Sequence, residues 1–287
     1  MPFNSMNQTT FGNLSIGRLF PWNAFPDFGD EYERIYERYD YRSRDTASDI
    51  VTLCEDHLAR LNKGDFGNPK RPRQLAFASS LRVMIANIRL DMRQNDGVLA
   101  MYETALDEAY ESGYHDVIYS CLHRLGGYFE IHQDDLQKAL DYYQRSLPFS
   151  CRRDWPHNYA QTLHNLAMVW ERLGEPDKAL AMYDLWITVG VAWRWPREYR
   201  FQCLIRNGRM AEVEAAANQM ELQGFGEILN CYVARKLLDR SGEADDTAKL
   251  GLERATKDKN RYWTKAFADL FETDTDSIAT ARRSSRG

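Results

Sequence analysis

The chain has 287 residues, of which 44% are apolar and 28% are charged, so wholesale disorder and collagen-like fibres are excluded. Its 37 basic and 42 acidic side chains give a formal charge of −5, which argues against a dedicated nucleic-acid-binding protein. No apolar run approaches the roughly 20 residues of a membrane-spanning helix. The N-terminus also lacks a basic start followed by an apolar stretch, so we expect a cytoplasmic protein with no membrane partner.

The first part of the chain predicts a cap in front of the main body. Residues 1–29 combine Asn, Thr, Gly and Pro with isolated aromatics, which is typical of an irregular arm that docks on the body. Over residues 30–39, four apolar side chains at positions i, i+3, i+4 and i+7 indicate an amphipathic helix. A second helix is expected over 46–61, and two Gly and two Pro break it over 63–73. Residues 1–73 therefore form the expected N-terminal arm and capping helices.

Residues 74–271 are predicted to be almost entirely helical, and residues 272–287 a flexible polar tail. Ala, Leu, Glu, Arg and Met dominate the long central part, and helix-breaking residues fall between the periodic segments. Alternating patterns of β-branched residues never last more than a few positions, so a βαβ or all-β fold is excluded.

Three glycines give this helical region a fixed period. Gly174, Gly208 and Gly242 are spaced 34 residues apart, each stands two positions after an arginine, and a new helical pattern follows each. Glycine adopts the left-handed conformation that ends a helix without a Cβ penalty, so we expect a chain reversal at each position. The preceding arginines, Arg172, Arg206 and Arg240, should lie in the last turn of a helix, where a cation complements the dipole. A helix–turn–helix with a fixed period is typical of a solenoid.

Two stretches carry a more detailed signature. In residues 160–191 the characteristic positions hold Leu163, Leu166, Ala167, Trp170, Gly174, Ala179 and Tyr183. In residues 119–149 they hold Leu122, Leu125, Gly126, Phe129, Ala139 and Tyr143, with one extra residue expected in the turn at 133–135 and Pro148 expected after the second helix. An earlier copy is indicated by residues 98–102, whose sequence echoes that of residues 179–183. Weaker copies surround Gly208 and Gly242, where Arg200, Phe201 and Arg235 replace the expected small or apolar residues.

Over residues 75–256 this pattern resembles the tetratricopeptide repeat. The resemblance implies an all-α fold: a right-handed α-solenoid of about five tetratricopeptide-like helical hairpins with an N-terminal helical cap. It also implies a protein that binds another protein or a peptide. Homo-oligomerisation stays open, because exposed repeat ends can stack.

Catalytic and metal-binding patterns are not found in the sequence. It contains no Gly-rich phosphate loop, nucleophile elbow, kinase or dinucleotide signature. Cys121 and His123, with His115 or His132, are the best metal candidates, but residues two apart on a helix point about 200° away from each other. We therefore predict no enzyme, cofactor or metal site, and mostly buried, reduced cysteines. An enzyme remains an alternative only if residues 1–73 complete an unrecognised site.

The resemblance implies that the first helix of each hairpin lines a groove that binds the partner. The alternative is a merely solvated helix face. Arg124 has the strongest case, because a guanidinium can bind a carboxylate in a bidentate manner. The chaperone-tail clamp known in the family is not expected, since only Asn165 matches it. The candidate groove residues are His123, Arg124, His164, Asn165, Met168, Glu198, Tyr199, Gln202, Tyr232 and Lys236.

A second candidate surface is a tryptophan-rich rim. Trp155, Trp193 and Trp195 stand in long connections between hairpins. They either pack these linkers or form a contact patch, since tryptophan is common in interface hot spots. The expected function is an adaptor or assembly scaffold, and the alternative is a toxin-neutralising (immunity) or regulatory partner protein.

Overall fold

The structure is a computed structural model, and its described residues are helical or in turns. Within them there is no strand, which confirms the predicted all-α class. The arm predicted over 1–29 and the tail predicted over 272–287 lie outside them, and of the helix predicted over 30–39 they include Ile35, which is helical and buried. The chain divides into two compact units, residues 1–173 and 174–287. The described residues are 35, 44–66, 71–150, 156–189, 195–220 and 222–270.

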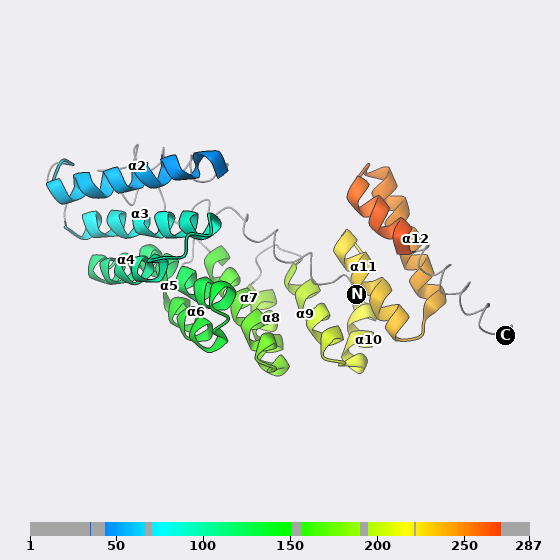
Figure 1. The fold of residues 1–287 in the computed structure, drawn as a ribbon. Helices are drawn as coiled ribbons and strands as arrows, with labels where there is room; N and C mark the ends of the chain where they lie inside the picture. Colours follow the sequence, from blue (N-terminus) through cyan, green and yellow to red (C-terminus); the bar gives the residue numbers. More distant parts are fainter. Residues whose placement is uncertain are drawn as a thin grey trace, which may run out of the picture. The chain divides into compact units, whose positions relative to one another are not determined.

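In unit 1, each helix packs on its neighbours in chain order (Figure 1). Helix α2 covers α3, α3 pairs with α4, α5 pairs with α6, and α7 packs against α6. Helix α3 is buried along most of its middle part, residues 76–88, because α2 and α4 both pack on it. It begins at Arg71, with Pro72 in its first turn, where a missing N–H costs no hydrogen bond. The helices are α2 (Arg44–Lys63), α3 (Arg71–Asp91), α4 (Val98–Ser112), α5 (His115–Gly127), the π-helical turn η3 (Tyr128–His132), α6 (Leu136–Ser150) and α7 (Pro156–Arg172).

A buried tyrosine holds the second helix of each hairpin in unit 1. The Tyr102 hydroxyl on α4 donates to Asn87 Oδ1 on α3 at 2.5 Å. Tyr143 on α6 is 2% exposed and donates to Glu130 Oε2 at 2.9 Å. Gly126 on α5 makes room for its ring, because a Cβ there would lie 2.6 Å from two ring carbons. The small residue expected at this position is therefore required by the packing.

The extra residue of the 119–149 copy lies in a different place from the predicted one. Asp134 adopts a left-handed conformation, as Gly174 does in the next copy, and each stands five residues before the buried alanine of the second helix. The spacing from Gly126 to Asp134 is eight residues, against seven from Ala167 to Gly174. The extra residue thus precedes the turn, where the helix winds as η3, and a π-helical turn accommodates one more residue than an α-helical turn.

Pro148 lies inside α6, so the prediction that it follows the second helix is wrong. The helix continues to Ser150, and the proline removes one backbone donor from its last turn. Near the end of a helix this loss is tolerated, because the preceding hydrogen bonds already hold the turn.

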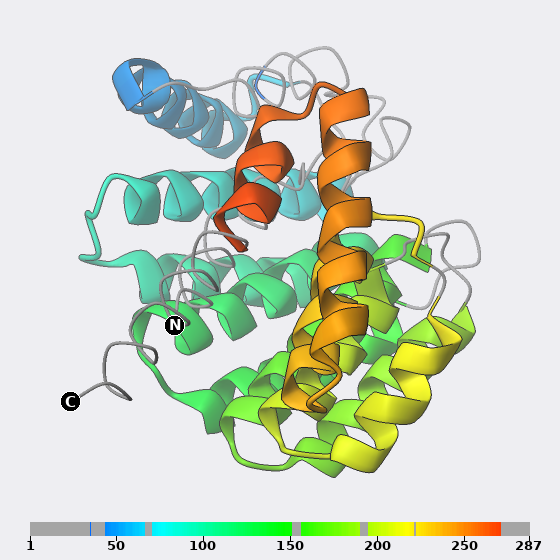
Figure 2. The same ribbon diagram turned by 90° about the vertical axis from the view of Figure 1, so that its right-hand side faces the viewer.

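Unit 2 continues with the same kind of neighbour-to-neighbour packing. Helix α8 packs on α9, α9 on α10 and α11, and α11 on α12. After α12, residues 261–270 form helical turns that run back beside it, in orange-red in Figure 2. The helices are α8 (Pro176–Val189), α9 (Trp195–Arg206), α10 (Met210–Gln219), α11 (Phe225–Leu237) and α12 (Ser241–Lys257).

The final helical segment caps unit 2. Phe267 is fully buried against Ile228 and Ala255. Gly251 in the middle of α12 allows this contact, since a Cβ there would lie 2.5 Å from the Phe267 ring. The opposite side of the segment exposes Arg261 and Lys265 to solvent. A polar outer face is what the terminal element of a helical stack requires.

The glycines predicted to end a helix in the left-handed conformation do so at two of the three positions. Gly174 and Gly208 have φ of 76° and 66°, as expected for left-handed helix ends. Gly242 is instead the second residue of α12, and the left-handed residue of that turn is Asp239, with φ of 57°. Aspartate tolerates this conformation better than most residues do, so the turn does not need the glycine.

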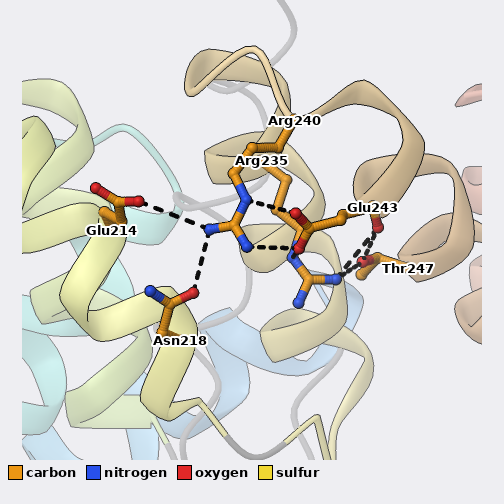
Figure 3. A network of polar contacts seen from close by, with 6 residues as sticks. All are labelled: Glu214, Asn218, Arg235, Arg240, Glu243 and Thr247. Carbon is orange, nitrogen blue, oxygen red and sulfur yellow. Dashed lines mark hydrogen bonds and ion pairs between the residues drawn. The ribbon is translucent and has the colours of Figure 1, made fainter.

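Arg240 likewise has a different role from the predicted one. Arg172 and Arg206 end α7 and α9, but Arg240 precedes the first turn of α12 and does not lie in the last turn of a helix. Its guanidinium donates to both carboxylate oxygens of Glu243, at 2.7 and 2.6 Å (Figure 3). It also reaches Asn218 Oδ1 at 3.1 Å and Glu214 at 3.9 Å, both on α10. Arg240 thus connects α10 to α12.

Arg235 extends the same network to α11. Its guanidinium donates to the Glu243 carbonyl at 3.2 Å and to the Thr247 hydroxyl (Figure 3). It stands at a position where the repeat pattern expects a small or apolar residue. Here the α11–α12 pairing therefore uses hydrogen bonds in addition to apolar packing.

Replacing Gly126 with alanine should destabilise the protein. The added Cβ collides with the Tyr143 ring, which is buried and held by Glu130, so we expect a loss of about 1–3 kcal/mol in the free energy of unfolding. Urea denaturation followed by circular dichroism measures this loss.

The matched control is Gly242→Ala. An added Cβ at this helical position meets no atom within 4 Å, so stability should stay constant or rise by up to about 1 kcal/mol. Equal stability changes in the two variants would contradict the account of the Gly126–Tyr143 contact.

Candidate functional site

The predicted groove residues fall into two groups, one in each unit. Those of unit 1 come from α5 and α7, and those of unit 2 come from α9 and α11. These are the first helices of successive hairpins, as the repeat pattern predicts. Each group is described separately.

A chain of side-chain hydrogen bonds connects α5 to α7. Gln161 Nε2 donates to Asn165 Oδ1 at 3.0 Å, and Asn165 Nδ2 lies 3.0 Å from His123 Nε2. Since an amide nitrogen can only donate, His123 Nε2 is the acceptor and the imidazole proton is on Nδ1. The structure thus brings two predicted groove residues together, although they are 42 positions apart.

His123 is a neutral, fixed part of this face. Its ring lies 5.4 Å from the Tyr119 ring and 5.5 Å from the Tyr143 ring, measured between centroids. Burial lowers the pKa of His123 to about 3, and the neighbouring Arg124 charge adds to this effect. The imidazole therefore stays uncharged at neutral pH, which suits a hydrogen-bond acceptor and not an acid–base catalyst.

Arg124 differs from its neighbours because its charge has no counter-ion in the described part of the chain. The side chain is partly buried, and its guanidinium has no hydrogen-bond or ion-pair partner among the described residues. Burial raises the pKa values of Tyr119 and Tyr143, and the nearby Arg124 charge opposes this rise. Arg124 thus places a cation with five N–H donors beside two tyrosines.

The other two residues predicted in unit 1 differ in exposure. His164 is only 6% exposed, and burial lowers its pKa to about 4. It therefore packs inside the unit and is not displayed on its surface. Met168, one turn further along α7, is partly exposed and provides the apolar part of this face.

Sequence reasoning missed Glu130, which connects three elements at one end of this face. Its carboxylate accepts from Tyr143 on α6 and lies 3.3 Å from Arg172 on α7. Arg172 also pairs with Asp134 at 2.6 Å. Burial raises the pKa of Glu130, and these donors oppose the rise. No sequence motif marks this residue, because its partners come from separate helices.

In unit 2, Tyr199 on α9 packs against α8, the second helix of the preceding hairpin. Its ring stacks on Tyr183 at 6.3 Å and on Trp186 at 6.2 Å, and burial raises its pKa. Both partners belong to α8 and are fully buried. Replacing Tyr199 would therefore disturb the fold as well as any binding surface.

Gln202 pairs with a residue that sequence reasoning did not single out. Its amide nitrogen donates to Asn230 Oδ1 at 3.3 Å, which connects α9 to α11. Asn230 is 4% exposed, and its own amide nitrogen has no hydrogen-bond partner among the described residues. Unit 2 thus repeats the arrangement of unit 1, with one polar pair joining consecutive first helices.

The remaining predicted residues of unit 2 contact their immediate neighbours. Lys236 pairs with Asp245 at 3.1 Å and lies 5.6 Å above the Tyr232 ring, which is buried. The Glu198 carboxylate lies against the first turn of α11, where a Cβ on Gly226 would be 2.7 Å from an oxygen.

The tryptophan rim is not described by the structure. Trp155 and Trp193 lie outside the described residues, and Trp195 begins α9 without a described side chain. The rim therefore stays a prediction.

The described part of the chain contains buried, protonated thiols at Cys54 and Cys121 and no cluster of metal ligands. Burial raises the pKa of Cys54 and of Cys121 to about 12, which keeps both thiols protonated and unreactive. Cys121 lies 3.3 Å from Ser79 Oγ, inside the hairpin stack. Within the described ranges no three His, Cys, Asp or Glu side chains gather in a way that would hold a metal ion. None of the helices described is long and apolar enough to cross a bilayer.

The low pKa of His123 predicts acid destabilisation of unit 1. The unfolded chain takes up a proton near the ordinary pKa of 6.5, and the folded protein does so only near 3, so stability is lost as the pH falls between these values. His123→Gln keeps an acceptor for Asn165 and removes the titration. The variant should lose less stability on acidification, by up to about 1.4 kcal/mol per pH unit.

Urea denaturation at a series of pH values from 7 down to about 4 measures this difference. An unchanged slope in His123→Gln would show that His123 is not held neutral.

Comparisons with known proteins agree with this architecture. No model of a known protein family matches the sequence, and the comparison with curated proteins gives no match. Among solved structures, BtubC (BKLC) from P. vanneervenii is 12% identical, with a TM-score of 0.57, over 74% of this chain and 91% of that chain. A putative kinesin light chain from Podosopora anserina with nearly identical TPR-like repeats is also 12% identical, with a TM-score of 0.51, over 67% of this chain and 92% of that chain. At this identity the likeness concerns the fold, and the chain has the fold of the tetratricopeptide-like helical repeat proteins.

Proposed function

We propose that this protein is a non-catalytic adaptor that binds a partner protein or peptide through the exposed sides of its first helices. The observation that carries the proposal is Arg124, a partly buried cation without a counter-ion in the described part of the chain. A charge held in this way costs desolvation energy that a bound anion would repay. Helical repeat proteins commonly mediate protein–protein interactions, which supports the same reading.

The surroundings of Arg124 suit the binding of a polypeptide. His123 and Asn165 hold each other in place across α5 and α7, so the surface is pre-organised. Met168 adds apolar area beside these polar groups. A mixture of arginine, aromatic and methionine side chains is typical of the energetically important part of an interface.

The first helices of unit 2 offer a second candidate surface with its own polar pair. Gln202 and Asn230 fix α9 against α11, and Glu198 is partly exposed beside them. We propose that this surface contributes to binding separately from that of unit 1.

The chemistry of the described residues supports binding over catalysis. The buried thiols are protonated and His123 is neutral and hydrogen-bonded, so neither is prepared for proton transfer or nucleophilic attack. We propose the adaptor role ahead of a toxin-neutralising or regulatory role, and action in the cytoplasm.

Hydrogen exchange of the bound complex tests the proposed face. A partner is captured from native lysate with the full chain, purified as a complex, and compared with the free protein. Protection should concentrate in α5 and α7, or in α9 and α11, because these helices form the proposed surfaces. Protection confined to the second helices α4, α6, α8, α10 and α12 would contradict the proposal.

Charge reversal provides a matched pair of variants for the same complex. Arg124→Glu should reduce recovery of a partner that protects α5 and α7, because it places a negative charge in the proposed surface. Lys138→Glu makes the same change on the exposed side of α6 and should leave recovery unaffected. Equal recovery with both variants would exclude Arg124 from the binding surface.

A further inference from the structure

The lack of a counter-ion at Arg124 contrasts with three other described arginines of unit 1, Arg82, Arg89 and Arg145. Arg82 donates to both oxygens of Glu108, at 3.1 and 3.0 Å. Arg89 pairs with Glu55 at 3.0 Å, and Arg145 pairs with Asp141 at 3.3 Å. These three arginines are neutralised within unit 1, whereas Arg124 has no such partner among the described residues and is partly buried.

The polar side chains around Arg124 already have hydrogen-bond partners, so its guanidinium is the donor that remains available to a ligand. The Asn165 amide is engaged on both sides, by Gln161 and by His123. The Tyr143 hydroxyl donates to Glu130, and the Tyr119 hydroxyl donates to the Asn158 carbonyl at 3.1 Å. A ligand that lies on this face thus meets one guanidinium fork, surrounded by groups that already have partners.

The helix backbone one turn beyond Arg124 carries no side chain. Gly127 follows Arg124 by three positions, so it lies on the same side of α5, and it is partly exposed. A Cβ at Gly127 would stand 3.7 Å from the Tyr143 hydroxyl, which is an ordinary contact distance. The absence of a side chain there is therefore not required by packing, and it leaves the helix backbone open to a ligand.

These features indicate which anionic group of a ligand would bind Arg124. A guanidinium binds a planar carboxylate in a bidentate manner, and one carboxylate balances its single charge. A phosphate group carries close to two negative charges and is usually held by several cations. His123 does not supply a second cation, since burial keeps it neutral. The end of a polypeptide chain is typically captured by several converging backbone donors, whereas this face offers one side chain.

We propose that Arg124 binds the side-chain carboxylate of an aspartate or glutamate in a partner segment that lies across α5 and α7. This inference rests on the proposed function and names the chemistry of the partner at that surface. The carboxylate occupies the guanidinium fork, and the neighbouring residues of the segment contact Met168 and the open backbone at Gly127. Since the pair is partly shielded from solvent, it contributes more than an exposed ion pair would.

Selection of random peptides displayed on phage, with the full chain as bait, tests this proposal. The peptides that bind should share an acidic residue at one position. A synthetic peptide from the selection should bind Arg124→Gln about tenfold to a hundredfold more weakly than the wild type. Changing the shared Glu to Gln in the peptide should weaken wild-type binding equally and cause no further loss with Arg124→Gln.

Charge exchange and chain-end modification distinguish the sources of the carboxylate. Arg124→Glu should bind the peptide with Lys in place of the shared Glu more tightly than it binds the original peptide. Amidation of the peptide C-terminus should leave the affinity unchanged. Arg145→Gln removes one positive charge from α6 and should also leave the affinity unchanged. Circular dichroism of each variant checks that the fold is retained.

The outcomes separate the inference from the proposed function. Selected peptides that lack an acidic residue, or an affinity that does not respond to Arg124→Gln, overturn the inference and leave peptide binding in place. Loss of binding on amidation also overturns it, because the chain end would then supply the carboxylate. If the full chain selects no peptide, both the inference and peptide recognition by this face fail.

Discussion

The close approach of a ring from one helix to the backbone of another is the contact on which the rest of the structure depends. In unit 1 the Tyr143 ring lies over Gly126, and in unit 2 the Phe267 ring lies over Gly251. A larger side chain at either glycine would push the helices apart. Because α6 is held so closely on one side of α5, the partner surface that we propose uses the other side of α5.

Polar pairs then fix the first helices against each other within each unit. His123 with Asn165 joins α5 to α7, and Gln202 with Asn230 joins α9 to α11. Such pairs hold side chains in one arrangement, which lowers the entropy cost of binding at the surface. The ion pairs and hydrogen bonds around Glu130 and around Arg240 also hold neighbouring helices together. Arg124, by contrast, has no counter-ion in the described part of the chain. This charge is the link between the packing of the helices and the proposed function.

Local features of the structure could be predicted from the sequence, whereas contacts that depend on how the hairpins stack could not. Helical periodicity and the glycines at 174 and 208 predict the class of fold and two of its turns, because both are properties of short segments. The prediction of a left-handed glycine at position 242 was wrong, since Asp239 takes the left-handed conformation in that turn. The extra residue of the 119–149 copy was expected in the turn but is accommodated by the π-helical turn η3. The His123–Asn165 pair spans 42 positions, so it becomes visible only once the hairpins are stacked. For the same reason the burial of His164 was missed.

Native-state hydrogen exchange of Gly126→Ala tests most directly whether close ring-to-backbone contacts hold each hairpin to its neighbours. We expect faster exchange in α5 and α6, a smaller increase in α4 and α7, and unchanged exchange in α11 and α12, because each helix depends mainly on the helices that it contacts. A uniform increase along the whole chain would contradict the account, since it would mean that stability is shared by one global core.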